Sequence, residues 1–410
     1  MAWIYAIGIN IFKFLIWVAA GFHPKAKLFH RGRQNLLQKI AREWTHPEQA
    51  IWFHFASLGE FEQGRPVLEE IKKRYPNEKI LITFFSPSGY EIRKNYTLAD
   101  AVYYLPLDTP QNAFQFVDLI RPKMAIFTKY EFWPNYFKAL HANQVPLFLI
   151  SAIFRPDQVF FKFYGGFYRS VLKAVTYFFV QNKESQDLLA GIGFKNVAIN
   201  GDTRLDSVFN LALHLTENEI ATIFKADSPV LVAGSTWAPD EKIIAAFIQA
   251  NPKWKCILAP HEVNDTHIKE ILAQFKNAIT YSESKNLSPT SIAAAQVLVI
   301  DNIGLLSKLY PYGKIAYIGG GFGVGIHNTL EAAAYGIPVF FGPKHQKFQE
   351  AQDLLRIGAA ASIKNSAEFQ AQMQALPDSP AGQRAAQYVQ TNKGATTLIL
   401  AKIEALNLLK

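Results

Sequence analysis

The stretch GGGFGVGIHNTLEAAAYGIPVFFGP, residues 319–343, carries the clearest signal of the fold. It begins where one apolar run ends (IAYIGG, 315–320) and finishes in another (PVFFG, 338–342), with a helix-like segment at 328–335 between them. A continuous apolar strand, a glycine-rich exit, a helix and a second apolar strand form the repeating unit of a parallel sheet covered on both faces. We therefore predict an α/β fold whose ligands bind at the strand ends.

The same alternation extends outward through most of the chain. The candidate strands of the second half are 229–234, 256–260, 297–301, 315–320 and 338–342. Those of the first half are 51–55, 80–85, 101–105, 124–128, 146–151 and 177–181. The predicted parts are an N-terminal anchor and basic segment (1–42), a first α/β domain (43–205), a linker (206–227) and a second α/β domain (228–410). The last helices of the second domain are candidates to pack back on the first.

The positive charge of the chain is concentrated near its start. Of 410 residues, 42 are basic and 33 acidic, a formal net charge of +9. Seven basic residues and no acidic ones lie in residues 1–42, which leaves +2 for the remainder. A nucleic-acid-binding body would carry a basic stripe, so this distribution argues against nucleic acid as a partner. The single cysteine, Cys256, excludes an internal disulfide and a CxxC metal site.

Residues 3–22, WIYAIGINIFKFLIWVAAGF, are apolar except for Asn10 and Lys13. As a helix they would reach about 30 Å, the thickness of a bilayer core. Asn10 and Lys13 share one face, so the helix can instead lie in the interface. A cleaved signal peptide fits less well, because the basic cluster follows the apolar run. We predict a membrane anchor, spanning or interfacial, with the body on the cytoplasmic side.

Two glutamates follow candidate strands of the first half. In SLGE (57–60), Gly59 permits a sharp turn and leaves Glu60 in the first turn of a helix. Glu131 follows the strand 124–128 in the same way. One interpretation is that each carboxylate merely complements a helix dipole. The other is a general base facing the ligand edge.

The second half offers groups suited to a nucleotide. Ser235 and Thr236 precede a helix and could seat a phosphate. Asn328 and Glu331 are three residues apart on a helical turn, where a carboxylate can accept hydrogen bonds from ribose hydroxyls. The segment 319–351 contains neither a GxGxxG fingerprint nor a P-loop, which argues against a dehydrogenase and a P-loop NTPase.

In chain order, the recognisable motifs are SLGE (57–60), PLD (106–108), EFWPN (131–135), NGDTRLD (200–206), GST (234–236), the run 319–343 and FQEA (348–351). Together they resemble the bacterial Kdo transferase family over nearly the whole chain. These enzymes attach 3-deoxy-D-manno-octulosonic acid (Kdo) from CMP-Kdo to the lipid A precursor. The resemblance implies a GT-B fold, with two Rossmann-like parallel-sheet domains facing across a cleft, and an inverting glycosyltransferase of lipopolysaccharide biosynthesis at the inner membrane. It implies no metal or other cofactor. The implied partners are CMP-Kdo, the lipid A precursor and an anionic membrane surface.

The resemblance also implies roles for individual residues. Glu60 matches the proposed general base, and Glu131 matches a second glutamate that orients acceptor or donor. The implied donor (CMP) site comprises Arg204, Ser235, Thr236, His261, Gly321, His327, Asn328 and Glu331. The acceptor or membrane side comprises Ser57, Ser88, Arg155, Lys162 and Arg169, the last two from the aromatic stretch VFFKFYGGFYR (159–169). That stretch is either a buried helix or an interfacial patch.

Several positions depart from the family pattern. Arg204 stands where the family has lysine, His261 where an arginine is expected, and Trp237 where histidine is usual. Ile153 replaces another arginine, with Arg155 as a possible substitute. The number of Kdo units transferred stays open. So do two alternatives: another GT-B nucleotide-sugar enzyme, such as a UDP-dependent transferase or epimerase, and a membrane-tethered two-lobed binding protein without chemistry.

Overall fold

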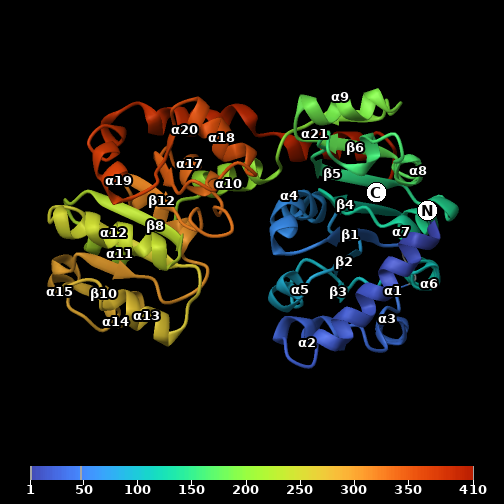
Figure 1. The fold of residues 1–410 in the computed structure, drawn as a ribbon, viewed down its shortest axis with the longest axis horizontal. Coiled ribbons are helices and arrows are strands. Elements are labelled where there is room, and N and C mark those ends of the chain that lie inside the picture. The colour runs from blue at the N-terminus through green and yellow to red at the C-terminus, as the bar shows by residue number, and fades with distance from the viewer. Residues whose placement is uncertain (1, 47–48, 410) are drawn as a thin grey trace. The chain divides into compact units, whose positions relative to one another are not determined.

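The computed structural model describes residues 2–46 and 49–409, which form two compact units (Figure 1). The first unit comprises the chain up to Asp206 together with the residues from Lys393 on, and the second comprises Ser207–Asn392. Each unit contains a seven-stranded sheet in which every pairing is parallel. The α/β prediction is confirmed.

The first sheet has the strand order β3-β2-β1-β4-β5-β6-β7. Its strands are β1 (Ile51–Phe55), β2 (Ile80–Phe84), β3 (Ala101–Tyr104), β4 (Met124–Thr128), β5 (Leu147–Ala152), β6 (Tyr177–Val180) and β7 (Val197–Ile199). Strands β1, β2 and β3 follow one another toward one edge of the sheet. Strand β4 then pairs with the other side of β1, and β5, β6 and β7 follow it toward the opposite edge. The strand order therefore reverses between β1 and β4, which is the position where open α/β sheets bind ligands.

The first sheet is covered on both faces by helices. The helices of this unit are α1 (Ala2–Ala19), α2 (Pro24–Arg31), α3 (Leu36–Glu43), α4 (Leu58–Arg74), α5 (Pro87–Arg93), α6 (Pro110–Ile120), α7 (Pro134–Ala142), α8 (Gly166–Leu172), α9 (Lys183–Gly191) and α21 (Ala395–Glu404). A further helix, α10 (Arg204–Leu213), runs across the boundary between the units. Pro110 and Pro134 each occupy the first position of their helix, where the missing N–H is not needed.

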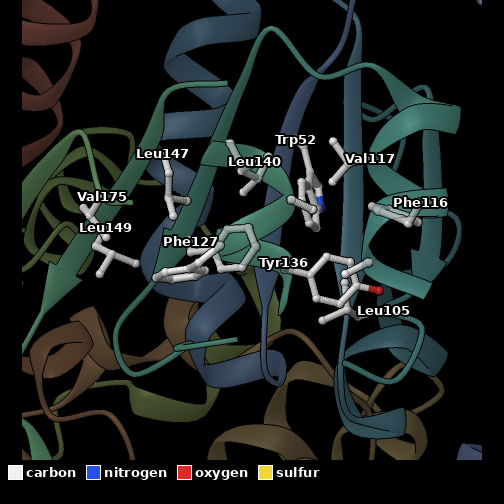
Figure 2. Close-up of a cluster of buried hydrophobic side chains, with 14 of the residues drawn as sticks. Trp52, Leu105, Phe116, Val117, Phe127, Tyr136, Leu140, Leu147, Leu149 and Val175 are labelled. Carbon is white, nitrogen blue, oxygen red and sulfur yellow. The ribbon is translucent and has the colours of Figure 1, made fainter. Parts of the chain in front are cut away.

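The two faces of β1 feed two separate cores. Trp52 packs against Phe127, Phe116 and Tyr136, with ring centroids 4.9–5.8 Å apart across this cluster, and Figure 2 shows these rings between the strands and helices. On the opposite face, Phe53 and its neighbours pack under α4 and α21. Burying each such side chain contributes about 1.5–3 kcal/mol.

The C-terminal helix α21 belongs to this second core of the first unit. Ile399, Leu400 and Ile403 are fully buried against the first sheet. The residues from Lys393 on therefore lie in the first unit, although they follow the second domain in the chain.

The N-terminal helix differs from the 20-residue apolar helix expected over residues 3–22. Helix α1 ends at Ala19, and among the described residues no helix is both long and apolar enough to cross a bilayer. One face of α1 is occupied by the protein itself: Tyr5 Oη donates to Asp108 Oδ2 at 2.6 Å, and Phe12 packs on Phe29. The interfacial alternative stays a prediction.

The second sheet has the order β10-β11-β9-β8-β12-β13-β14, so its strand order reverses between β8 and β12. Its strands are β8 (Val230–Thr236), β9 (Lys255–Pro260), β10 (Ala278–Thr280), β11 (Val297–Val299), β12 (Ile315–Ile318), β13 (Val339–Phe341) and β14 (Ala360–Ser362). The helices are α11 (Glu219–Lys225), α12 (Ala238–Ala250), α13 (Asp265–Leu272), α14 (Tyr281–Ser284), α15 (Pro289–Ala294), α16 (Leu306–Leu309), α17 (Leu330–Ala334), α18 (Gln349–Arg356), α19 (Ser366–Gln372) and α20 (Ala381–Asn392).

Candidate active site

Glu60 lies in the first turn of α4, directly after β1 and beside the switch point of the first sheet. Ser57 is the N-cap residue with extended backbone (φ −148°), and its hydroxyl donates to Glu60 Oε2 instead of capping the helix. The side chain of Glu60 is half-buried. Ser57 thus restrains a carboxylate that helix and sheet place at the ligand edge.

Glu131 follows β4 on the other side of the same switch point and accepts two hydrogen bonds. His54 Nε2 lies 3.1 Å from Glu131 Oε2, and Trp133 Nε1 donates to the same oxygen at 2.8 Å. His54 Nδ1 is 2.8 Å from Thr83 Oγ1. The ring therefore joins two oxygens: with Nδ1 accepting from Thr83, Nε2–H donates to Glu131.

His54 was not among the residues singled out from the sequence. It is fully buried in β1, and its side chain points to the face that also carries Trp52. Its distance of 77 positions from Glu131 gives no local signal. The contact depends on the pairing of β1 with β4, in which His54 lies opposite Phe127.

An aromatic row leads from Glu131 toward α1. Trp133 packs on Phe85, which follows β2, at a centroid distance of 4.7 Å. Phe85 in turn stacks on Phe12 of α1 at 6.1 Å. The N-terminal helix is therefore in direct contact with the residues that surround this carboxylate.

The predicted acceptor-side residues lie in several places of the first unit. Ser88 is exposed at the start of α5, with its hydroxyl 3.0 Å from that of Ser86. Arg155 donates to Tyr130 Oη at 3.1 Å. Arg169 donates to the backbone carbonyls of Phe160 and Lys162 at 3.0 and 2.7 Å, so it braces the 159–169 loop.

The aromatic stretch 159–169 is neither wholly buried nor wholly exposed. Phe160 is buried, whereas Phe163 is 94% exposed and Tyr164 51% exposed. The buried interpretation therefore describes Phe160, and an interfacial patch formed by the exposed rings stays a prediction.

Arg204, predicted in the donor site, lies in the first unit and pairs with Asp202. Its Nη2 and Nε donate to Asp202 Oδ2 at 2.6 and 3.0 Å. Burial alone would raise the pKa of Asp202, but the guanidinium beside it holds that pKa below its usual value. The other predicted donor residues belong to the second unit.

Ser235 and Thr236 end β8 at the switch point of the second sheet. Ser235 has a left-handed backbone (φ +53°), which a serine adopts only at some strain. Thr236 Oγ1 donates to Glu241 Oε1 at 3.0 Å. The other carboxylate oxygen of the buried Glu241, Oε2, lies 3.0 Å from His267 Nε2. The pKa of His267 is raised, because this carboxylate outweighs the opposing effect of burial.

Asp240 joins the two loops that flank this switch point and was not recognised in the sequence. Its Oδ2 accepts from the backbone N–H groups of Trp237 and Gly320, each at 3.0 Å, and its Oδ1 accepts from Tyr317 Oη at 2.8 Å. The side chain is fully buried, and burial raises its pKa. An acid three residues after the N-cap residue Trp237 was the only local signal in the sequence.

Three rings form a stack beside these loops. The rings of Trp237 and His261 lie 4.7 Å apart, and those of His261 and His327 lie 4.3 Å apart, each pair inclined by 27°. Trp237 Nε1 donates to His327 Nε2 at 3.5 Å. Burial, together with repulsion from His261, lowers the pKa of His327 to about 4. His327 is therefore neutral at pH 7.

Asn328 and Glu331 interact, but Asn328 precedes α17 and does not lie on the helical turn that was expected over 328–335. Asn328 Nδ2 donates to Glu331 Oε1 at 3.0 Å, and Asn328 Oδ1 accepts from Leu330 N at the start of α17. Gly321 lies against Gly342 at the end of β13. A Cβ on Gly321 would come within 2.6 Å of Gly342 N, so only glycine permits these two strand ends to approach.

No group of three or more His, Cys, Asp or Glu side chains within residues 2–46 and 49–409 is arranged to hold a metal ion.

The family model for "3-Deoxy-D-manno-octulosonic-acid transferase (kdotransferase)" matches residues 30–207. The 3-deoxy-D-manno-octulosonic acid transferase of Aquifex aeolicus (strain VF5) is 30% identical over 331 residues, which cover 78% of this chain and 84% of that protein. The chain belongs to this family. The Haemophilus influenzae (strain KW20) transferase of the same name is 28% identical over 316 residues, 74% of this chain and 73% of the relative.

Solved structures show the same fold at low sequence identity. A UDP-GlcNAc 2-epimerase from Neisseria meningitidis, bound to UDP-GlcNAc, aligns with a TM-score of 0.60 at 14% identity over 87% of this chain and 100% of that one. MurG from Acinetobacter baumannii aligns with a TM-score of 0.54 at 12% identity over 88% and 100%. These likenesses confirm the GT-B-type architecture. The family makes the protein a Kdo glycosyltransferase of lipopolysaccharide synthesis.

Proposed function

We propose that this protein transfers Kdo from CMP-Kdo to a hydroxyl of the lipid A precursor with inversion, and that Glu60 is the general base. The observation that carries the proposal is the position of the two glutamates. Glu60 follows β1 and Glu131 follows β4, so they flank the switch point of the first sheet. That is where an α/β unit presents side chains to a ligand.

In this mechanism Glu60 removes the proton from the acceptor hydroxyl as the hydroxyl oxygen attacks the anomeric carbon of Kdo. The bond from that carbon to the CMP phosphate oxygen breaks on the opposite face, and CMP leaves with the bonding electron pair. Ser57 restrains one carboxylate oxygen of Glu60 through its hydrogen bond. Glu131, fixed by His54 and Trp133, orients the reacting hydroxyl.

We assign the donor to the second unit. The switch point between β8 and β12 brings Ser235 and the N-terminus of α12 to one edge, where backbone N–H groups favour a phosphate. Glu331, positioned by Asn328, is the acceptor for the ribose hydroxyls. The stacked rings of Trp237, His261 and His327 offer a flat surface beside them.

We further propose that α1 rests on the cytoplasmic face of the inner membrane. Its outward face is apolar apart from Asn10, with Trp3, Phe14 and Trp17 each more than half exposed. Such a helix lies in the interface with its apolar face among the lipid chains. The exposed basic residues of 1–42 add about 1 kcal/mol each near an anionic leaflet.

The decisive experiment follows product masses when the protein is incubated with CMP-Kdo and a tetraacylated lipid A precursor. The Glu60→Gln variant should lose transfer by about 10²–10⁴-fold, the range of general-base catalysis, while retaining CMP binding. Glu184→Gln is the matched control, because Glu184 also lies in the first turn of a helix after a strand of the same sheet, away from the switch point. Near-wild-type turnover by Glu60→Gln would disprove the assignment of the base.

A further inference from the structure

A pocket of about 640 Å³ lies in the first unit between α1, the α2–α3 segment and the loop that follows β3. Its lining contains Lys13, His30 and Arg33 and six side-chain amides from Asn and Gln residues. None of the lining residues is Asp or Glu. A cavity with cations and amide donors but no carboxylate is suited to an anion.

Arg33 supplies a fixed charge at this pocket. Its guanidinium donates to the backbone carbonyls of Leu105 at 2.9 Å and Phe85 at 2.7 Å, and it lies 3.6 Å from the centre of the Phe29 ring. In the described part of the chain, no carboxylate forms a salt bridge with Arg33, Lys13 or His30. Carbonyl groups satisfy hydrogen bonds but do not neutralise a positive charge, so a bound anion would be stabilised here.

The same pocket adjoins the apolar face of α1. Lys13 and Ile16 line it from α1, while Phe14 and Trp17, their neighbours in the chain, are 58% and 60% exposed. When an amphipathic helix lies in the interface, its polar flank meets the headgroups. A pocket on that flank is therefore at the depth of lipid phosphates.

We propose that this pocket binds the phosphate of a bilayer phospholipid headgroup. The inference rests on the proposed docking of α1 and adds a specific lipid site to it. The loop after β3 that lines the pocket lies at the carboxyl edge of the first sheet, the edge that also carries Glu60. A phospholipid held there fixes the direction in which this edge meets the membrane.

A soluble phospholipid separates pocket binding from the diffuse attraction of basic residues to a charged surface. The probe is dihexanoyl phosphatidylglycerol below its micelle concentration, titrated into the full-length protein by calorimetry. Wild type should bind one molecule saturably, and Lys13→Gln should weaken binding by about fivefold or more, the equivalent of about 1 kcal/mol for one charge. The control Lys25→Gln removes an exposed charge that does not line the pocket and should leave binding unchanged.

A second variant fills the pocket without removing a charge. Gln115 is exposed on the rim, and Gln115→Trp should also weaken binding of the soluble lipid. Equal affinities of wild type, Lys13→Gln and Gln115→Trp, or no saturable binding by wild type, would overturn the proposal. Full displacement of the lipid by equimolar inorganic phosphate would overturn its lipid specificity. The titration contains no CMP-Kdo and no acceptor, so a failure to bind lipid leaves the transferase proposal intact. Conversely, near-wild-type transfer by Glu60→Gln would disprove the assignment of the base without affecting the lipid site.

Discussion

The two units place their functional side chains at equivalent positions but use carboxylates differently. In the first unit Glu60 and Glu131 flank the switch point and are hydrogen-bonded to Ser57, His54 and Trp133. In the second unit Asp240 and Glu241 are buried and bind the unit's own backbone and side chains. In the proposed mechanism the first edge takes up a proton and the second holds the anionic nucleotide, and the different use of carboxylates fits that division.

The largest structural effect is expected from Asp240→Ala. The substitution leaves three donors without their acceptor: the N–H groups of Trp237 and Gly320 and the Tyr317 hydroxyl. Each buried unpaired group costs about 1–3 kcal/mol, so the second unit should lose about 2–4 kcal/mol of stability after partial relaxation. Urea unfolding measures the loss.

The control for this test is Asp265→Ala. Asp265 also lies in the first turn of a helix of the second unit but is exposed. It should change stability by less than about 1 kcal/mol, the range of a helix-dipole interaction. Similar losses of stability in both variants would contradict a special role for the buried Asp240, because it would then act only through the helix dipole, like any acidic residue in a first helical turn.

A smaller effect, on turnover, is expected from His54→Phe. The substitution keeps a ring in the core but removes the hydrogen bonds to Glu131 and Thr83. If His54 positions Glu131, kcat should fall about tenfold to a hundredfold with little change in KM. Losses of this size are typical when a residue that orients a site residue by a hydrogen bond is removed. His54→Gln, whose amide can still donate toward Glu131, should recover most of the loss. Equal kcat values for the Phe and Gln variants would contradict the positioning role.

Much of this arrangement could be predicted from apolar runs. All eleven expected strands are present, with ends displaced by a residue or two. The sequence did not reveal β7, β10 and β14, each three residues long and at a sheet edge. An edge strand is half exposed and needs no continuous apolar run, so it leaves no clear pattern.

The contacts of the candidate site also differ in how far the sequence reveals them. The Ser57–Glu60 and Asn328–Glu331 contacts each join a residue just before a helix to a glutamate three positions on in its first turn, a short spacing that the sequence displays. The contact between His54 and Glu131 depends on the pairing of two strands far apart in the chain. An interfacial position of α1 stays a prediction from its apolar run, whereas the contacts that hold its inner face, such as Tyr5 to Asp108, arise only from tertiary packing.

The smallest expected effect is on the pH dependence of stability in the second unit, and it comes from His327. The folded-state pKa of His327 is about 4, below the unfolded value near 6.5, because burial and His261 disfavour its charge. The unfolded chain then binds the proton first, so the stabilisation is complete above pH 6.5 and is lost as pH falls toward 4. The His327→Phe variant lacks this titrating group. Between pH 6.5 and 4 it should therefore lose about 1 kcal/mol less stability than the wild type, a figure that allows for the partial exposure of His327. Urea unfolding of the second unit between pH 7 and 4 measures it, with the exposed His214→Phe as control. If the wild type and His327→Phe lose stability in parallel, the ring stack does not hold His327 neutral.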